Sequence, residues 1–309
     1  MTSNEIIVVG SANMDFVVSV KNFPHPGETL FGRSFGMFPG GKGANQAVCC
    51  AKLGVATHFI GRIGTDILGE KLAASMQRDG VQLDSLIRDE GSSTGIALIT
   101  VDRTGQNEIV VVSGGNMRLT PDDIESKQDL FATARVLLVQ LETPRETVIR
   151  AVSLAKQHNL LTILNPAPAC KLPGSLLRMV DYLTPNETEA EILTGIKVKD
   201  TSSAERAGRK LLTKGVKHVI VTLGRRGSLL LAPGTAKYFP APRVKAVDAT
   251  AAGDAFSGAL AVSLAEGSVV EEAIPFATTV AALSVTRMGA QSSLPTREEV
   301  SRFKRTLLG

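Results

Sequence analysis

Short apolar runs rich in β-branched residues alternate along this chain with longer stretches in which apolar residues recur every three or four positions. The short runs predict strands, and they lie at 6–9, 57–60, 136–141, 161–164, 182–184 and 219–223. The longer stretches predict helices at 44–53, 69–78, 145–157, 187–193 and 204–214, then near 252–266 and 271–285. Such alternation is typical of βαβ units. It predicts an α/β fold in which helices cover both faces of a mostly parallel sheet.

Two pairs of strand-like runs interrupt this alternation, because no helix separates the members of either pair. The pairs lie at 16–20 with 29–38 and at 94–101 with 108–112. The loop at 102–107 is typical of a hairpin turn. We interpret the pairs, drawn from about 14–39 and 94–113, as one small β-sheet that leaves the main body as a lid. A plain edge extension of the main sheet explains the pattern equally well.

Length and composition limit the class of protein. The length of 309 residues suggests about two domains, but the continuous alternation predicts a single α/β domain over 1–309. The hydrophobic fraction of 43% and the charged fraction of 21% argue against disorder and coiled coil. No apolar run is long enough to span a bilayer, and residues 1–5 lack the basic patch of a signal peptide. We therefore expect a cytoplasmic protein with no membrane partner.

The net charge of +4 raises nucleic acid as a partner. However, the basic residues form no block of five or more, and 11 Phe and 2 Tyr without Trp offer few stacking surfaces. The three cysteines lack the spacing of a metal site, and Cys49 and Cys50 are best explained as small buried side chains. We expect a small-molecule ligand and no nucleic acid.

Residues 248–258 carry the most informative chemistry. Small residues at 251–253 let the backbone approach a ligand, and a helix that begins there directs unpaired N–H groups outward as an anion site. Asp254 would repel an anion, so its position suits a general base that takes a proton from an attacking hydroxyl. Asp254 is also a residue that caps helices, and this segment alone leaves the two interpretations even.

Glycine-rich and polar segments also occur near the first predicted strands. Residues 40–45 lead into a helix and suit either a ligand contact or a tight turn, but they match neither a P-loop nor a dinucleotide motif. Asn13 and Asp15 follow the first strand on a shared side, where ligands of parallel sheets bind. They suit the recognition of hydroxyls, or an Asx turn.

Further polar residues lie at the ends of later strands. Asn165 and Glu142 each follow a predicted strand. Asn186 and Glu189 have the spacing of a capping box, and their oxygens also suit Mg²⁺ held through its waters. Residues 222–227 admit a nucleotide or form a hairpin into the next segment.

Taken together, these segments resemble the ribokinase family of carbohydrate kinases, also called the PfkB family. Residues 40–45, Gly-Gly-Lys-Gly-Ala-Asn, look like its N-terminal signature, and 248–254, Asp-Ala-Thr-Ala-Ala-Gly-Asp, like its C-terminal one. The segments at 165–168, 185–189 and 222–224 follow the family's order. The resemblance covers essentially the whole chain.

The resemblance implies a ribokinase-like three-layer αβα sandwich with a β lid, and ATP-dependent phosphorylation of D-ribose at its 5-hydroxyl. It makes Asp254 the base, which also contacts the sugar, and makes an anion hole of the N–H groups of Ala251, Ala252 and Gly253. The implied sugar-binding residues are Asn13, Asp15, Gly40, Gly41, Lys42, Asn45 and Glu142. The implied nucleotide-side residues are Asn186, Thr222, Gly224, Gly227, Gly253 and Thr278. A water-mediated Mg²⁺ contact is implied at Glu189, and a K⁺ site at Asp248, Thr250, Ser284, Arg287, Gly289 and Ser293.

The resemblance also implies a homodimer joined through the β lid. Ala249 departs from the family's pattern, which usually has Thr or another residue of a restricted set, so K⁺ affinity is the property it affects. Two alternatives stay open. One is a kinase of the same family for 2-deoxyribose or another sugar or nucleoside. The other is an inactive sugar-binding regulator, against which the intact Asp254 argues.

Overall fold

The computed structural model describes residues 4–308, so the first three residues of the stretch considered as a signal peptide lie outside it. Its main sheet has the strand order β13-β12-β11-β10-β9-β8-β1-β4-β5. The strands from β11 to β5 are parallel, and β12 and β13 are antiparallel additions. The strand bounds are β1 Ile6–Val9, β4 Thr57–Gly64, β5 Leu86–Asp89, β8 Val136–Val139, β9 Leu161–Leu164, β10 Tyr182–Leu183, β11 His218–Thr222, β12 Ser228–Ala232 and β13 Thr235–Phe239.

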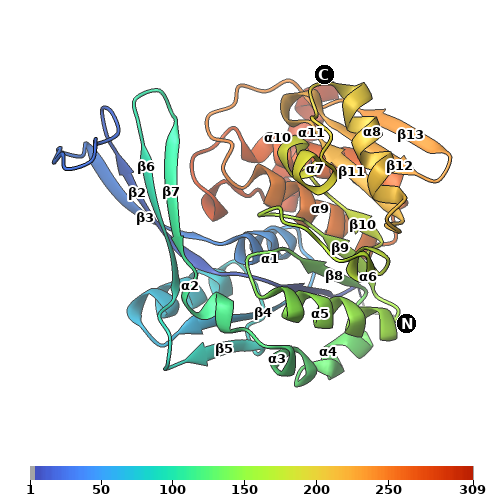
Figure 1. The fold of residues 1–309 in the computed structure, drawn as a ribbon, viewed down its shortest axis with the longest axis horizontal. Helices are drawn as coiled ribbons and strands as arrows, with labels where there is room; N and C mark the ends of the chain where they lie inside the picture. The colour runs from blue at the N-terminus through green and yellow to red at the C-terminus, as the bar shows by residue number, and fades with distance from the viewer. Residues whose placement is uncertain (1–3, 309) are drawn as a thin grey trace.

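Helices cover both faces of this sheet (Figure 1). The alternation along β1 shows why: Ile6 and Val8 belong to one hydrophobic core, and Ile7 and Val9 to the other. The first core is closed by α1 Lys42–Lys52, α2 Ile67–Arg78, α9 Ala252–Ala265, α10 Val270–Ser284 and α11 Arg297–Leu308. The second is closed by α3 Pro121–Glu125, α4 Gln128–Thr133, α5 Arg145–Gln157, α6 Gly174–Leu177, α7 Glu187–Thr194 and α8 Thr201–Leu212. The three-layer αβα sandwich is thereby confirmed.

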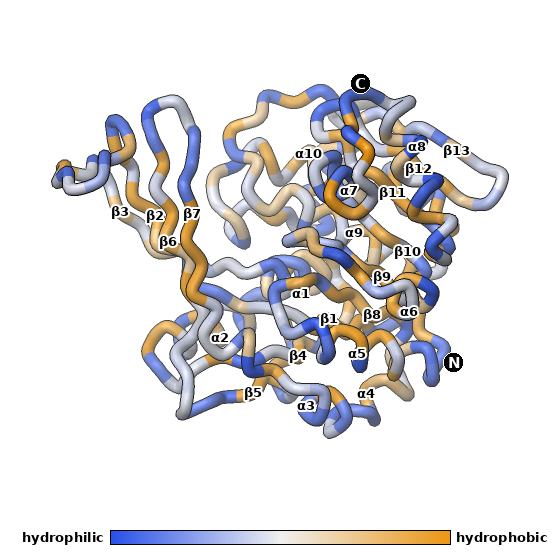
Figure 2. The backbone as a smooth tube through the Cα atoms, viewed as in Figure 1, coloured by the Kyte–Doolittle hydropathy of each residue, from blue (hydrophilic) through white to orange (hydrophobic). Residues whose placement is uncertain are grey.

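A second sheet stands out from the main body (Figure 1). It has the order β3-β2-β6-β7 and contains β2 Asn13–Ser19, β3 Ser34–Gly40, β6 Gly95–Val101 and β7 Asn107–Val112. Both predicted pairs are antiparallel hairpins, and they join through parallel pairing of β2 with β6. The small sheet is therefore separate, and the interpretation as an edge extension is wrong. Figure 2 shows apolar residues along its strands and hydrophilic residues in its turns.

The other differences lie at element ends and in segments with little pattern. The strand expected over 136–141 ends at Val139, because the N–H of Leu141 donates to the carbonyl of Ala167, outside the strand pairing. Gln140 and Glu142 consequently lie just past the strand end. The helix expected at 204 begins earlier, since Asp200 caps it. The pattern did not predict β5, β13, α3, α4, α6, α11 or the 3₁₀ turns η1 Gly114–Arg118, η2 Gly224–Arg226 and η3 Gln291–Ser293. Among the described helices, none has the length and apolarity needed to cross a bilayer.

Candidate active site

A cavity of about 200 Å³ lies where β9, β10 and β11 end and α9 begins. Parallel sheets bring the carboxyl ends of their strands to one edge, where ligands bind. The predicted residues in its wall are Lys42, Asn186, Glu189, Thr222, Ala251, Ala252, Gly253 and Asp254. Asn165, which follows β9, also lines it, together with Thr184 and Ser257. The structure thus brings the C-terminal signature together with residues from four other segments.

Asp254 lies in the first turn of α9, and its side chain is buried. Its Oδ2 accepts a hydrogen bond from Nδ2 of Asn45, and its Oδ1 accepts one from Nε2 of Gln46, both at 2.9 Å. The residue that caps α9 is Ala251, so the interpretation of Asp254 as the helix cap is wrong. Burial raises the pKa of Asp254 above its usual value, although the charge of Lys42 and these two hydrogen bonds oppose the shift. A buried carboxylate that favours a proton is suited to general-base chemistry.

The N-terminus of α9 presents backbone donors to the same cavity. Ala251 has the left-handed conformation, with φ 59°, which turns the chain into the helix. The N–H of Ala252 already donates to the carbonyl of Ala249 at 3.2 Å. Within residues 4–308, the N–H groups of Ala251 and Gly253 have no partner. Of the three N–H groups expected in the anion hole, these two are therefore available to an anion.

The residues predicted to bind the sugar meet where β2 begins beside α1. Asn13 pairs with Gly40 across β2 and β3, and a Cβ added at Gly40 would lie 2.2 Å from Oδ2 of Asp15. Gly41 has φ 87°, a conformation that L side chains rarely adopt, and a Cβ there would lie 2.7 Å from the backbone nitrogen of Asn13. Glycine is needed at Gly41, where backbone lies in the way, and at Gly40 any side chain would displace the carboxylate of Asp15.

Three carboxylates and one lysine dominate the electrostatics of this region. The carboxylate of Glu142 accepts hydrogen bonds from Oγ of Ser11 at 2.5 Å and from the backbone N–H of Lys42 at 3.1 Å. Burial and the charges of Glu142 and Asp254 raise the pKa of Asp15 to about 7. Burial disfavours the charge of Lys42, but the carboxylates of Asp254 and Glu142 outweigh it and raise the pKa of that ammonium.

Most of the residues predicted to contact the nucleotide lie at the end of β11 and the start of α7. Asn186 forms an isolated bridge to Thr222 and caps α7, and its capping box with Glu189 is confirmed. Each carboxylate oxygen of Glu189 accepts one bond from Asn186, at 2.8 and 2.9 Å. Gly224 and Gly227, with φ 54° and 110°, form the turn between β11 and β12, so the expected hairpin is confirmed. Thr278 is buried in α10 and bonds the carbonyl of Ile274, away from the cavity wall.

Comparison with known proteins decides the family. The model of the pfkB family carbohydrate kinases matches residues 3–297. This chain belongs to the pfkB family of carbohydrate kinases. A ribokinase of Haemophilus influenzae is 42% identical, with 96% of this chain and 97% of the relative covered. A deoxyribokinase of Salmonella typhi is 36% identical, with 97% and 98% covered.

A longer relative and a solved structure complete the comparison. The chain spans 55% of a bifunctional ribokinase/ribose-5-phosphate isomerase A of Fructilactobacillus sanfranciscensis, at 42% identity and 96% coverage of this chain. The structure of Arabidopsis thaliana ribokinase complexed with ribose and ATP is 35% identical and superimposes with a TM-score of 0.90. That likeness covers 98% of this chain and 99% of the other.

In this pfkB kinase, only part of the predicted K⁺ loop converges. Oδ1 of Asp248 accepts the N–H and O–H of Thr250, and its Oδ2 accepts the N–H of Gly289 at 2.9 Å. These hydrogen bonds outweigh burial and lower the pKa of Asp248, so it is ionised at neutral pH. The side chain of Arg287 instead pairs with Glu299 of α11.

The remaining members of the K⁺ set have local partners. The hydroxyls of Ser284 and Ser293 donate to carbonyls of their own turns, Ala281 and Ala290. Among the described residues, no three His, Cys, Asp or Glu side chains cluster as metal ligands. Asp248 is therefore the one member of the set that offers an anionic oxygen to a cation.

Several polar residues of this kinase's site were not predicted as site residues. Nε2 of Gln140 donates to Oε1 of Gln46 at 2.6 Å, and Gln46 in turn bonds Asp254 and Asn165. Gln46 follows Asn45 directly, so its place in the N-terminal signature was an available signal. Asn116, which bonds Asn13, lies in a segment with no pattern that pointed to it.

Proposed function

We propose that this chain transfers the γ-phosphoryl group of ATP to the 5-hydroxyl of D-ribose and forms ribose 5-phosphate and ADP. The observation that carries the proposal is the buried carboxylate of Asp254, which shares one cavity with the free N–H groups of Ala251 and Gly253. The ribokinase relatives, and the solved relative that holds ribose and ATP, support this substrate pair.

The proposed chemistry divides between the base and the backbone. Asp254 removes the proton of the ribose 5-hydroxyl. The hydroxyl oxygen of ribose then attacks the γ-phosphorus of ATP as the bond between that phosphorus and ADP breaks. The N–H groups at the start of α9 stabilise the negative charge on the transferred group. One such donor contributes roughly 10²–10³ in rate in other enzymes. On the sugar side, Asn13, Asp15, Lys42, Asn45 and Glu142 bind and orient the hydroxyls.

On the nucleotide side, we propose contacts with ATP from Asn186, Thr222 and the Gly224–Gly227 turn. Thr278 is proposed with less support, because it lies away from the cavity wall. Each oxygen of Glu189 keeps a lone pair beyond its bond to Asn186, which fits a hydrated Mg²⁺. Mg²⁺ would neutralise charge on the ATP phosphates.

We also propose that K⁺ binds beside this site. The ionised Asp248 fits a monovalent cation, with Thr250 and Gly289 holding its carboxylate in place. K⁺ would add positive charge near the start of α9. Ser284, Arg287 and Ser293 enter the proposal through their backbone oxygens, because their side chains have other partners.

The decisive experiment is a panel of pentoses and nucleosides with ATP, with and without K⁺. Ribose turnover above that of every other substrate supports the proposal. The deoxyribokinase relative favours 2-deoxyribose as the second candidate, and preferential turnover of that sugar would replace ribose while keeping the chemistry. If no substrate is turned over but sugar binds, the chain is a regulator instead.

The base is tested with Asp254→Asn. We expect sugar and ATP to bind within a few-fold of wild type and kcat to fall by about 10³ or more, because the amide cannot accept the proton. Asp122→Asn, an exposed acid in α3, is the matched control and should retain full kcat. Comparable turnover in Asp254→Asn and wild type would refute the role of the base.

We further propose that the chain is a single domain over 1–309 in the cytoplasm, and that it dimerises through the small sheet, which acts as a lid. Unpaired cysteines support a reducing compartment. Consecutive side chains Ile109–Val112 of β7 are all exposed. Because they alternate between the two faces of the sheet, both faces have uncovered apolar groups, one for the substrate side and one for a partner copy.

The dimer is tested with Val110→Glu, measured by light scattering and sedimentation. Val110 is 61% exposed, and Val269, at 58% in the turn before α10, is its matched control. We expect Val110→Glu to be monomeric and Val269→Glu to keep the wild-type mass. A wild-type monomer, or an equal effect of the two substitutions, would contradict the proposed interface.

A further inference from the structure

Asn116 is a buried amide in η1, only 2% exposed, and the backbone of Ala12 dictates its orientation. Its Oδ1 accepts the N–H of Ala12 at 2.9 Å, and its Nδ2 donates to the carbonyl of Ala12 at 3.2 Å. A backbone N–H can only donate and a carbonyl can only accept. The reversed amide would therefore set donor against donor and acceptor against acceptor, so one orientation is chemically required.

The orientation of the Asn116 amide also determines that of the Asn13 amide, at the first residue of β2. The Nδ2 of Asn116 also donates to Oδ1 of Asn13 at 2.7 Å. The carbonyl oxygen of Asn13 is thus occupied, and its Nδ2 has no partner within residues 4–308. A Cβ added at Gly95 would lie 2.3 Å from both Asn13 Oδ1 and Asn116 Nδ2, so this amide pair is packed against the start of β6.

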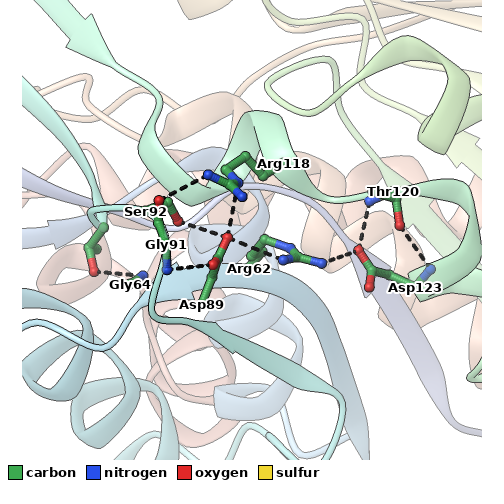
Figure 3. A network of polar contacts seen from close by, with 9 residues as sticks. Arg62, Gly64, Asp89, Gly91, Ser92, Arg118, Thr120 and Asp123 are labelled. Atoms are coloured by element: carbon green, nitrogen blue, oxygen red, sulfur yellow. Dashed lines mark hydrogen bonds and ion pairs between the residues drawn. The ribbon is translucent and has the colours of Figure 1, made fainter.

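The turn that carries Asn116 is itself anchored by an ionic network (Figure 3). Arg118, the last residue of η1, pairs with Asp89 and donates to the carbonyl of Gly91. Arg62 of β4 bridges Asp89 and Asp123 at 3.2 and 2.7 Å. These contacts join β4, β5, η1 and the start of α3. They tie the turn to the main sheet and to α3.

We propose that Asn116 is a positioning residue for sugar recognition, and this rests on the proposed function. By holding the carbonyl oxygen of Asn13, it leaves the Nδ2 of Asn13 to donate to a sugar hydroxyl oxygen. Asp15, two residues along the same face of β2, then accepts the proton of a hydroxyl. A donor and an acceptor side by side recognise adjacent hydroxyl groups, which links the geometry of η1 to sugar affinity.

The test is a double-mutant cycle of Asn116→Asp and Asn13→Ala, with KM and kcat measured for ribose and for ATP. Asp at 116 keeps the bond from the N–H of Ala12 but loses the bond to the carbonyl of Ala12. It also cannot donate to Asn13, whose amide then turns its carbonyl toward the sugar. We expect about a tenfold rise in KM for ribose, with kcat and the KM for ATP within twofold of wild type. In the Asn13→Ala background, Asn116→Asp should have no further effect on KM.

Two further variants separate positioning from general loosening. Thr147→Val removes a 2.6 Å bond from Thr147 Oγ1 to the carbonyl of Leu119, just after η1, and should leave KM for ribose unchanged. Asn13→Asp presents an acceptor to the sugar without altering Asn116, and should raise KM as Asn116→Asp does. This variant tests the donor even if changes at Asn116 prevent folding.

Additive effects in the cycle would overturn the proposal, because a new charge near Asp15 would act with or without the amide of Asn13. An unchanged KM in Asn13→Asp would also overturn it. Wild-type turnover decides the proposed function separately. If the substrate panel identifies a different sugar, the same cycle with that sugar tests the role of Asn116 independently of ribose.

Discussion

The proposed contact between Asp15 and the sugar predicts that sugar affinity depends on pH near neutrality. Burial and the charges of Glu142 and Asp254 raise its pKa to about 7 from the usual 3.8. The ionised carboxylate of Asp15 accepts a hydrogen bond from a sugar hydroxyl more strongly than the protonated form does. Below pH 7 the free enzyme mostly holds a proton there, and binding of the sugar has to displace it. Sugar affinity therefore falls as the pH falls through 7.

The magnitude follows from this pKa. About one molecule in eleven has Asp15 ionised at pH 6, and about ten in eleven at pH 8. If only the ionised form binds the sugar, the KM for ribose rises about tenfold between pH 8 and pH 6. Saturating sugar keeps Asp15 ionised, so this change appears in KM and not in kcat. Asp15→Asn should have a higher KM for ribose, and this KM should not change between pH 6 and pH 8.

The assay follows ADP release at saturating ATP, with ribose varied at each pH from about 5.5 to 8.5. The KM for ATP at saturating ribose is the internal control, because we propose that Asp15 contacts the sugar and not the nucleotide. A wild-type KM for ribose that stays constant over this range would refute the reasoning. So would an acidic rise in KM that persists unchanged in Asp15→Asn.

Two more substitutions test the surroundings of the base. In Gln46→Leu, Asp254 loses a hydrogen bond that favours its charged form. We expect the acidic limb of the kcat profile to move to higher pH, because the pKa of Asp254 rises further when this hydrogen bond is lost; an unmoved limb would contradict this. Ala251→Gly removes the strain of the left-handed conformation, which costs about 1–2 kcal/mol. Glycine also adds conformational entropy to the unfolded chain, which costs the folded state about 0.5–1 kcal/mol, so the net effect should be stabilising. The free energy of unfolding by urea should rise by up to about 1.5 kcal/mol, and by more than in Asn159→Gly, since Asn tolerates its own positive φ better. Equal or lower stability than wild type would show that Ala251 is not strained.

The pattern along the chain predicted most of the fold, because it depends on local periodicity. The continuous apolar run Ile6–Val9 forms a strand that is buried on both faces of the sheet. The helix α5 matches its predicted bounds of 145–157. The pattern failed for β5 and for the short helices α3 and α4, which have few residues over which a period can be recognised. The pattern also could not predict that β2 pairs with β6, since some eighty positions separate these strands.

The candidate site divides in the same way between local and distant information. The two signatures located Asp254 and the glycines beside α1, but they left Asp254 equally suited to cap a helix. Only the tertiary structure shows that its carboxylate bonds Asn45 and Gln46, whose helix lies about two hundred residues earlier. For Asn116 the sequence offered no signal at all.

The sequence by itself determined the α/β class, the two strand pairs of the small sheet, the pfkB signatures and the residue types available for phosphoryl transfer. These features depend on spacing within single segments, where neighbouring residues are tied by the backbone. The tertiary structure alone decided which polar atoms meet, which N–H groups at α9 stay free, and why Asp15 has a pKa near 7. Hydrogen bonds act over about 3 Å and desolvation depends on burial, so both depend on how distant segments pack.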